Sequence, residues 1–161
     1  MKANILIIYA TRHGFTLKCV LLMKERLGES CDMHLLKGND SPNPADYDTI
    51  LIGGSIHTGS IQKNIRRFCT NNQKLLLERR VGLFLSCMME GEEAQKEFDE
   101  AYPDWLREHA QAKTIVGGAF YFDRMNLMER AIIRKVAGVD KTVERFEKDK
   151  IEAFLKKITA D

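Results

Sequence analysis

The sequence lacks the features typical of membrane-spanning, secreted and zinc-binding proteins. No apolar run approaches the roughly 20 residues that a membrane-spanning helix requires. The opening MKANILIIYATRHG has too short an apolar stretch, and no small-residue cleavage site, for a secretory signal. The four cysteines (Cys19, Cys31, Cys69 and Cys87) stand far apart, without the spacing of a zinc or redox motif. We therefore expect a cytoplasmic protein with reduced thiols.

An excess of one charge sign is also missing. Lys and Arg number 25 and Asp and Glu 23, so the formal net charge of +2 is too small to indicate a nucleic-acid partner. Two of the three prolines fall in NDSPNPADYD, which we interpret as a surface connection. With 161 residues, 44% of them hydrophobic, the chain is long enough to bury a sizeable core. We predict a single domain over residues 1–161.

Short apolar runs predict five strands. The four clearest are NILIIY, TILIGG, VGLFLS and TIVGGAF, and DMHLL is a weaker candidate. These runs are rich in Ile, Leu and Val and too uniformly apolar for half-exposed antiparallel strands. Uniformly apolar strands are typical of a parallel sheet that is covered on both faces.

Helical patterns lie between these runs. FTLKCVLLMKERLG is helical in composition and ends on a glycine suited to a C-cap. GEEAQKEFDEAYPDWLREHAQ predicts another helix, disturbed near Pro103. Two further helical faces are Ile61, Ile65, Phe68 and Cys69, and Ile151, Phe154, Leu155 and Ile158. Strands that alternate with helices predict an α/β three-layer sandwich with a five-stranded parallel sheet of order 2-1-3-4-5.

The stretch ATRHGFT, residues 10–16, follows the first predicted strand. In such a sheet, ligands bind beyond the carboxyl ends of the strands at the topological switch point. Gly14 permits a close turn, while Thr11, Thr16, the backbone N–H groups and the positive end of the next helix suit a phosphate dianion. The stretch matches neither G-x-G-x-x-G nor the P-loop pattern. The alternative is an ordinary turn at Gly14 with Thr16 as a helix cap.

Three segments carry a resemblance to a known family. T-x-x-G-x-T after a first strand resembles the phosphate loop of flavodoxins, which bind flavin mononucleotide (FMN). More narrowly, the chain resembles the flavodoxin-like family that contains menaquinone-dependent protoporphyrinogen IX dehydrogenase. The segments are YATRHGFT, YDTILIGGSIHTGSIQKNIRRFC and VGGAFYFDRMNLMERAIIRKVAG, in the order of that family. The resemblance implies a flavodoxin-like fold over the whole chain.

The same resemblance implies an FMN site built from three loops. The phosphate would be wrapped by Thr11, Arg12, His13, Gly14, Phe15 and Thr16. One side of the isoalloxazine ring would be lined by Ser55, Ile56, His57, Thr58 and Gly59. The other edge of the ring would be bordered by Ser86, Cys87, Met88, Met89, Glu90 and Gly91.

This sequence departs from the flavodoxin pattern because neither ring loop contains the aromatic residue that usually stacks on the flavin. His57, Met88 or Met89 are candidates to replace it, since methionine sulfur packs well against aromatic rings. Phe120, Tyr121 and Phe122, at the fifth strand, are further candidates.

Single residues of the ring loops allow two interpretations each. His57 is either a flavin contact or a solvent-exposed loop residue, and it lacks a partner at metal-ligand spacing. Cys87 fits a small apolar group at a strand end better than a reactive thiol. Glu90 begins a charged run typical of a solvated helix face; near a flavin its charge would disfavour the anionic reduced ring.

Residues 124–138 form a basic amphipathic segment. Met128, Ile132 and Val136 share one helical face, and the cations are Arg124, Arg130, Arg134 and Lys135. Such a helix either contacts an anionic surface or ligand, or packs on its own domain with its charges in water. The resemblance adds a membrane-resident quinone and a substrate with carboxylates as candidate partners, and under the first of these two interpretations the helix would contact the inner face of the cell membrane.

The leading functional hypothesis is an FMN-dependent oxidoreductase that passes electrons from protoporphyrinogen IX to a quinone in heme biosynthesis, as the resemblance implies. No Ser/His/Asp or paired-carboxylate arrangement is evident, so the flavin would carry the chemistry and we name no catalytic side chain. The alternative is a flavodoxin-type electron carrier that binds redox proteins and has no small-molecule substrate. A third hypothesis is an interaction module that has lost FMN.

Overall fold

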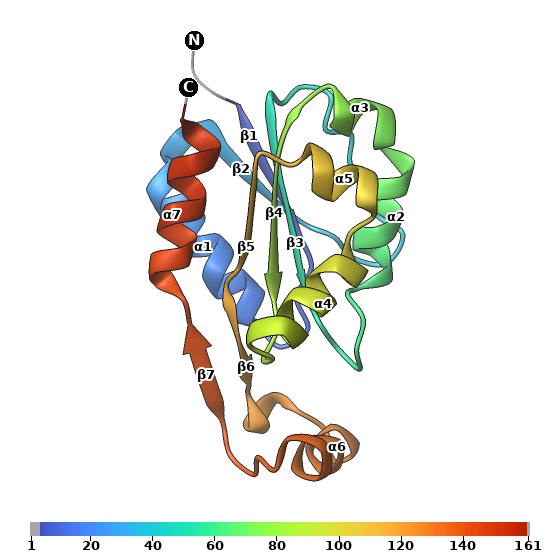
Figure 1. Ribbon diagram of the computed structural model, residues 1–161, viewed down its shortest axis with the longest axis vertical. Helices are drawn as coiled ribbons and strands as arrows, with labels where there is room; N and C mark the ends of the chain where they lie inside the picture. Colours follow the sequence, from blue (N-terminus) through green and yellow to red (C-terminus); the bar gives the residue numbers. More distant parts are fainter. Residues whose placement is uncertain (1–3, 161) are drawn as a thin grey trace.

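Five parallel strands form the centre of this computed structural model, which describes residues 4–160 (Figure 1). They are β1 (Ile5–Tyr9), β2 (Cys31–Leu35), β3 (Thr49–Ser55), β4 (Arg80–Ser86) and β5 (Ala112–Ile115). Their order in the sheet is β2-β1-β3-β4-β5, and every pairing is parallel. The predicted order 2-1-3-4-5 is therefore confirmed. Every residue of β1 is buried, which explains its uniformly apolar sequence.

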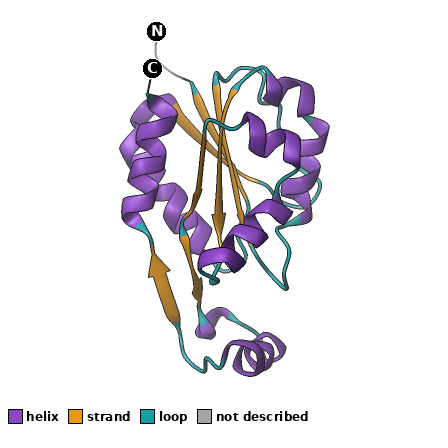
Figure 2. Ribbon diagram, viewed as in Figure 1, coloured by secondary structure: helices purple, strands orange, loops and turns teal. Residues whose placement is uncertain are grey.

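Helices cover both faces of the sheet and produce three layers (Figure 2). One apolar cluster joins the sheet to α1 (Phe15–Leu27) and α7 (Lys148–Thr159). A second cluster joins the opposite face to α2 (Lys63–Asn71), α3 (Gln73–Leu77), α4 (Gly91–Ala101) and α5 (Asp104–His109). Successive side chains of a strand point to opposite faces, so Ile7 belongs to the first cluster and Ile8 to the second. A 3₁₀ turn, η1 (Gly28–Ser30), connects α1 to β2.

The predicted helical segments agree with the structure except at two boundaries. Residues 91–111 contain two helices, α4 and α5, and Pro103 at the break is the N-cap of α5. Ile61 was expected on a helix but precedes α2, because Gln62 has an extended backbone at the N-cap. Ile61 is nevertheless buried in the core.

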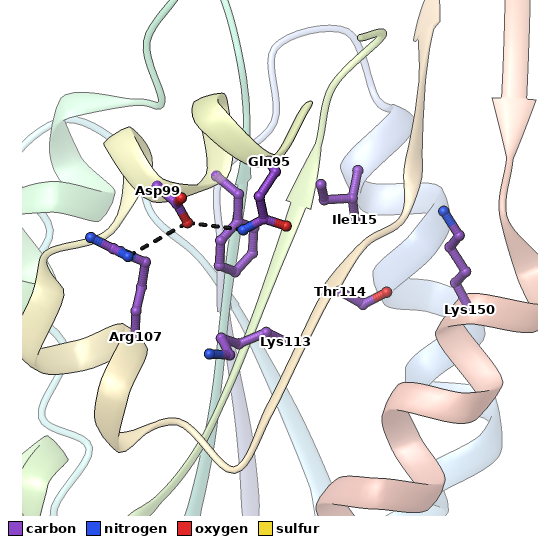
Figure 3. A pocket seen from close by; sticks show the side chains of 8 residues that line it. Gln95, Asp99, Arg107, Lys113, Thr114, Ile115 and Lys150 are labelled. Carbon is purple, nitrogen blue, oxygen red and sulfur yellow. Dashed lines mark hydrogen bonds and ion pairs between the residues drawn. The ribbon is translucent and has the colours of Figure 1, made fainter. Parts of the chain in front are cut away.

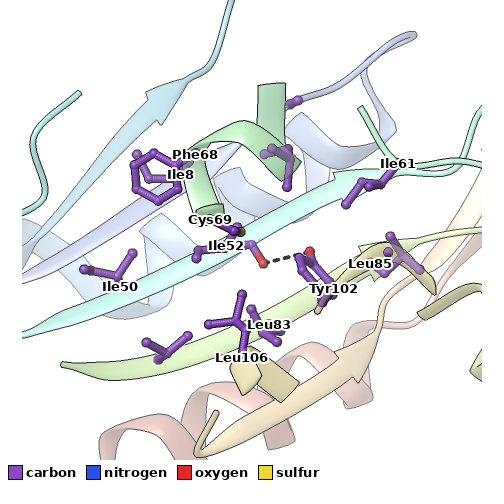
Figure 4. Packing of buried hydrophobic residues seen from close by; sticks show 14 of the residues in the cluster. Ile8, Ile50, Ile52, Ile61, Phe68, Cys69, Leu83, Leu85, Tyr102 and Leu106 are labelled. Atoms are coloured by element: carbon purple, nitrogen blue, oxygen red, sulfur yellow. Dashed lines mark hydrogen bonds between the residues drawn. The ribbon is translucent and has the colours of Figure 1, made fainter. Parts of the chain in front are cut away.

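Tyr102, which follows α4, ties two central strands together (Figure 4). Its hydroxyl lies 3.1 Å from the carbonyl oxygen of Ile52 in β3 and 2.6 Å from that of Phe84 in β4. The side chain is fully buried, and burial raises the pKa of its phenol well above the ordinary value. The hydroxyl therefore remains a hydrogen-bond donor.

The fifth apolar run leaves the sheet halfway along. Val116 separates β5 from β6 (Gly117–Phe120), which begins at a glycine with a φ of 93° and pairs antiparallel with β7 (Val143–Phe146). Between them lie η2 (Phe122–Arg124) and α6 (Leu127–Ala137). We call residues 117–147 the insert. In Figure 1 it projects beyond the carboxyl ends of the strands, with α6 at the far end.

Candidate functional site

The loops after β1, β3 and β4 meet at the carboxyl edge of the sheet. Ser55 pairs in register with Ser86, and the Ile56 N–H donates to the Ser86 carbonyl oxygen at 3.0 Å. The hydroxyls of Thr16 and Ser86 form a buried hydrogen bond of 3.1 Å. The structure thus brings together the three segments that the sequence predicted, residues 11–16, 55–59 and 86–91.

The first of these, residues 11–16, carries several backbone N–H groups without an acceptor at the start of α1; we call it the anion loop. Gly14 has a φ of 100°, in the left-handed region, and its N–H donates to Thr11 Oγ1 at 3.0 Å. Within residues 4–160, the N–H groups of Arg12, His13, Phe15 and Thr16 have no acceptor. Free N–H groups at a helix N-terminus favour an anion.

Thr16 does not have the helix-capping role that was one alternative. The N-cap of α1 is Gly14, and no side chain caps this end. Thr16 is fully buried, and its hydroxyl forms a hydrogen bond with the Ser86 hydroxyl beneath the loop. This contact fixes the anion loop to the end of β4.

The insert contacts the anion loop from outside, which the sequence analysis missed. Glu129 of α6 accepts hydrogen bonds from Arg12 Nε and His13 Nε2, both at 2.9 Å. Partial burial raises the pKa of Glu129, but the Asn126 N–H, Arg12 and His13 lower it more, so that this pKa is about 2. Arg124 donates to the His13 carbonyl oxygen at 2.7 Å.

Residues 55–60 form a tight, preformed turn. His57 and Ser60 exchange backbone hydrogen bonds, and the two residues between them, Thr58 and Gly59, have φ values of 47° and 81°. Gln62 holds Ser55 by accepting from its N–H at 2.9 Å and donating to its hydroxyl at 2.7 Å. His57 thereby lies on a defined backbone.

His57 is the titratable group of this turn. Burial, together with the positive charges of Arg12 and His13, lowers its pKa, although Glu129 acts in the opposite direction. His57 is therefore neutral at pH 7, and its half-buried ring offers an uncharged aromatic surface.

Arg145 of β7 organises residues 87–90. Its guanidinium donates to the carbonyl oxygens of Cys87, Met88 and Met89 at 3.2–3.3 Å. It also pairs with Glu90 at 3.2 Å, although the Glu90 side chain is 72% exposed. No local sequence pattern marks Arg145 as a contact of this loop, because it lies 57 positions from Met88.

Cys87 is a buried structural group, as its sequence context indicated. Burial raises the pKa of the thiol to about 11, so it is protonated at neutral pH and a poor nucleophile. Among the residues described, all four cysteines are buried and none forms a disulfide.

Family comparison agrees with the fold. The model of the flavodoxin domain family matches residues 6–146. The chain belongs to the flavodoxin domain family. No curated protein sequence is significantly similar to it.

Solved flavodoxins share this architecture at low sequence identity. A short-chain flavodoxin associated with a PDU bacterial microcompartment is 12% identical, with a TM-score of 0.60 over 97% of this chain and 96% of that one. A Streptococcus pneumoniae flavodoxin is 16% identical, with a TM-score of 0.58 over 97% of each chain. A Lactobacillus acidophilus flavoprotein, solved in complex with FMN, is 16% identical, with a TM-score of 0.50 over 72% of this chain and 91% of that one.

In this flavodoxin-domain protein the aromatic residues of the insert have arginine neighbours. Tyr121 is buried, donates its hydroxyl to Glu144 and has the Arg124 guanidinium 4.2 Å from its ring centre. Phe122, also buried, lies beneath Arg130 and Arg134. The structure thus places these rings within the insert, whereas His57 and Met88 lie on the two ring loops themselves.

A separate hollow of about 560 Å³ lies beside the edge strand β5 (Figure 3). Its lining includes Gln95, Asp99, Arg107, Lys113 and Lys150. Asp99 accepts from Gln95 at 2.9 Å and pairs with Arg107 at 3.5 Å. The hollow shares no residue with the three loops at the carboxyl edge of the sheet.

Proposed function

We propose that this protein binds FMN at the carboxyl edge of its sheet, with the phosphate on the anion loop. The observation that carries the proposal is the left-handed Gly14 beside the acceptor-free N–H groups of Arg12, His13, Phe15 and Thr16. Gly14 has a φ of 100°, which side chains with a Cβ rarely adopt, so a larger residue would strain the loop. Family membership and the FMN complex of the Lactobacillus relative support the same cofactor.

The two other loops would hold the isoalloxazine ring. Ile56, the uncharged His57 and the half-buried Met88 offer the apolar or aromatic surface that a tricyclic ring needs. Arg145 would hold the 87–89 backbone in place at the ring's edge. When bound, FMN supplies reversible electron transfer, and the protein orients it and limits the access of water.

Titration with FMN, followed by quenching of flavin fluorescence, tests the cofactor. We expect saturable binding to the wild type and binding weakened at least about tenfold in Gly14→Ala, because a φ of 100° strains a residue with a Cβ and so distorts the loop. Gly38→Ala is the matched control: Gly38 also has a positive φ of 52°, but a Cβ there has nothing within 4 Å. If the wild-type protein does not bind FMN, the oxidoreductase and electron-carrier hypotheses both fail and only the interaction module remains.

For the reaction, we propose oxidation of protoporphyrinogen IX with transfer of the electrons to a quinone. The support is the position of α6 beside the anion loop, with an exposed apolar face and the cations Arg134 and Lys135. Such a face suits a substrate with an apolar body and carboxylates. Anaerobic protein given protoporphyrinogen and a menaquinone analogue should produce porphyrin fluorescence faster than the background without protein.

An electron carrier without a small-molecule substrate is the second candidate. Flavodoxins that span 97% of this chain with the same fold favour it. A carrier would bind FMN and exchange electrons with a redox protein, yet would leave protoporphyrinogen oxidation at the background rate. The two assays together therefore separate the three hypotheses.

We also propose that residues 124–138 make a peripheral contact with an anionic membrane. Within residues 4–160 no helix has the length and apolar character needed to span a bilayer. Leu127, Met128 and Val136 are exposed beside Arg134 and Lys135, a combination typical of interfacial helices. Flotation with anionic vesicles at low salt should recover the wild type, and Arg134→Gln/Lys135→Gln should weaken recovery.

A further inference from the structure

A carboxylate of the insert is bound to the loop that we assign to the phosphate. Glu129 lies 2.9 Å from Arg12 Nε and 2.9 Å from His13 Nε2, and its side chain is only 13% exposed. Arg12 and His13 also supply two of the acceptor-free N–H groups of the anion loop. One loop therefore presents two side-chain N–H donors, one of them the Arg12 guanidinium, to Glu129 and backbone donors to a phosphate.

The rest of α6 is weakly attached to the protein. None of its residues is buried, and Leu127, Met128 and Val136 are 82%, 74% and 73% exposed. Arg130 and Arg134 contact Phe122, which belongs to the same insert. Among the described residues, Glu129 makes the only hydrogen bonds and ion pairs that join α6 to anything outside the insert.

We propose that Glu129 is an internal competitor for the anion loop: it sets the affinity of the loop for phosphate-bearing ligands, and it ties α6 to the loop only while no phosphate is bound. This inference rests on the proposed phosphate site. A dianion at the N–H groups of Arg12 and His13 is repelled by the nearby carboxylate and attracted by the Arg12 guanidinium, for which it competes with Glu129. Because coupling between two binding events is reciprocal, the phosphate weakens the Glu129 contact as much as Glu129 weakens phosphate binding.

Glu129→Gln tests the competition without removing the start of the helix. Asn126 and Glu129 form a capping box, in which Glu129 Oε1 accepts from the Asn126 N–H, and glutamine fills the same role. The substitution therefore removes the charge and preserves the cap. Asp140→Asn is the matched control, because it makes the same charge change at an exposed residue of the insert.

The first measurement is the affinity of wild type and both variants for FMN and for riboflavin, which has no phosphate. We expect Glu129→Gln to bind FMN about tenfold more tightly, within the usual range of coupling between two sites. Riboflavin affinity should be unchanged in this variant, and Asp140→Asn should resemble the wild type with both ligands. Unchanged or weaker FMN binding in Glu129→Gln, or an equal gain for riboflavin, would overturn the proposal.

The second measurement is hydrogen exchange of the amides of residues 127–137, with inorganic phosphate as the probe. Phosphate should speed exchange in the wild type and have no effect in Glu129→Gln, where exchange is already fast. Exchange that phosphate leaves unchanged in the wild type would contradict the release of α6. If no variant binds FMN but phosphate still releases α6, the proposed cofactor is wrong and the competition stands.

Discussion

The sheet and the insert are held together by different forces. In the sheet, Ile7, Ile52 and Leu83 are fully buried and the neighbouring strands keep an unbroken register. In the insert, α6 buries no residue and is tied to the rest of the domain through the contacts of Glu129 with Arg12 and His13. Apolar packing fixes the three loops in place, whereas the polar contacts of α6 can be exchanged for those of a charged ligand. The three loops are therefore held by a packed sheet, whereas we propose that α6 beside them is released when a phosphate binds.

The largest effect should follow from crowding the sheet at Gly53. A Cβ there would lie 2.0–2.3 Å from three ring carbons of Phe84, which in turn packs edge-on against Phe154. Since this core has no room to adjust, we expect Gly53→Ala to lower the free energy of unfolding by about 3 kcal/mol. Urea unfolding measures the loss. A loss below about 1 kcal/mol would mean that the Phe84 ring can move aside to make room for the added Cβ.

A smaller effect within the core should follow from Tyr102→Phe. This change removes the hydroxyl that bonds to the carbonyl oxygens of Ile52 and Phe84, and we expect a loss of about 1–1.5 kcal/mol. Tyr47→Phe is the control, because the Tyr47 hydroxyl bonds to Asp32 at the surface. Equal losses for the two variants in urea would show that burial does not strengthen the Tyr102 contact.

Acid should weaken the attachment of the insert before it affects the core. The pKa of Glu129 is lowered from 4.5 to about 2, so the ionised carboxylate stabilises the folded state above pH 4.5 and this contribution disappears as the pH falls towards 2. The effect should stay below about 1 kcal/mol, as for other ion pairs near the surface. The difference in unfolding free energy between wild type and Glu129→Gln, measured from pH 6 to pH 2.5, should shrink on acidification. A constant difference would contradict this assignment.

The smallest effect should come from the exposed face of α6. Leu127→Ala and Val136→Ala remove side chains that touch little, so the free energy of unfolding should change by no more than about 0.5 kcal/mol. Leu76→Ala, at a fully buried position of α3, should cost about 3 kcal/mol. A large loss at Leu127 or Val136 would show that α6 packs against the domain, and the contrast between the two regions would fail.

The sheet and the loops at its carboxyl edge could be predicted from the sequence, but the contacts that the insert makes with these loops could not. The order of the five strands and the position of the anion loop followed from apolar runs and from the connection rules of parallel sheets. The contacts of Glu129 with Arg12 and of Arg145 with Met88 join residues 117 and 57 positions apart, and no local pattern marks such pairs. The N-x-x-E capping box predicts the start of α6, but it does not show what the carboxylate of Glu129 faces.

The amino-acid order by itself determined the alternating strands and helices, because burial on both faces of a sheet requires uniformly apolar runs. It also placed a glycine where the chain leaves β1 and must adopt a positive φ. Only the tertiary structure decided that Thr16 would bond beneath the loop to Ser86 and that the insert would fold back onto Arg12 and His13. These contacts depend on the path of the chain through space, which sets the distances between charges that lie far apart in sequence.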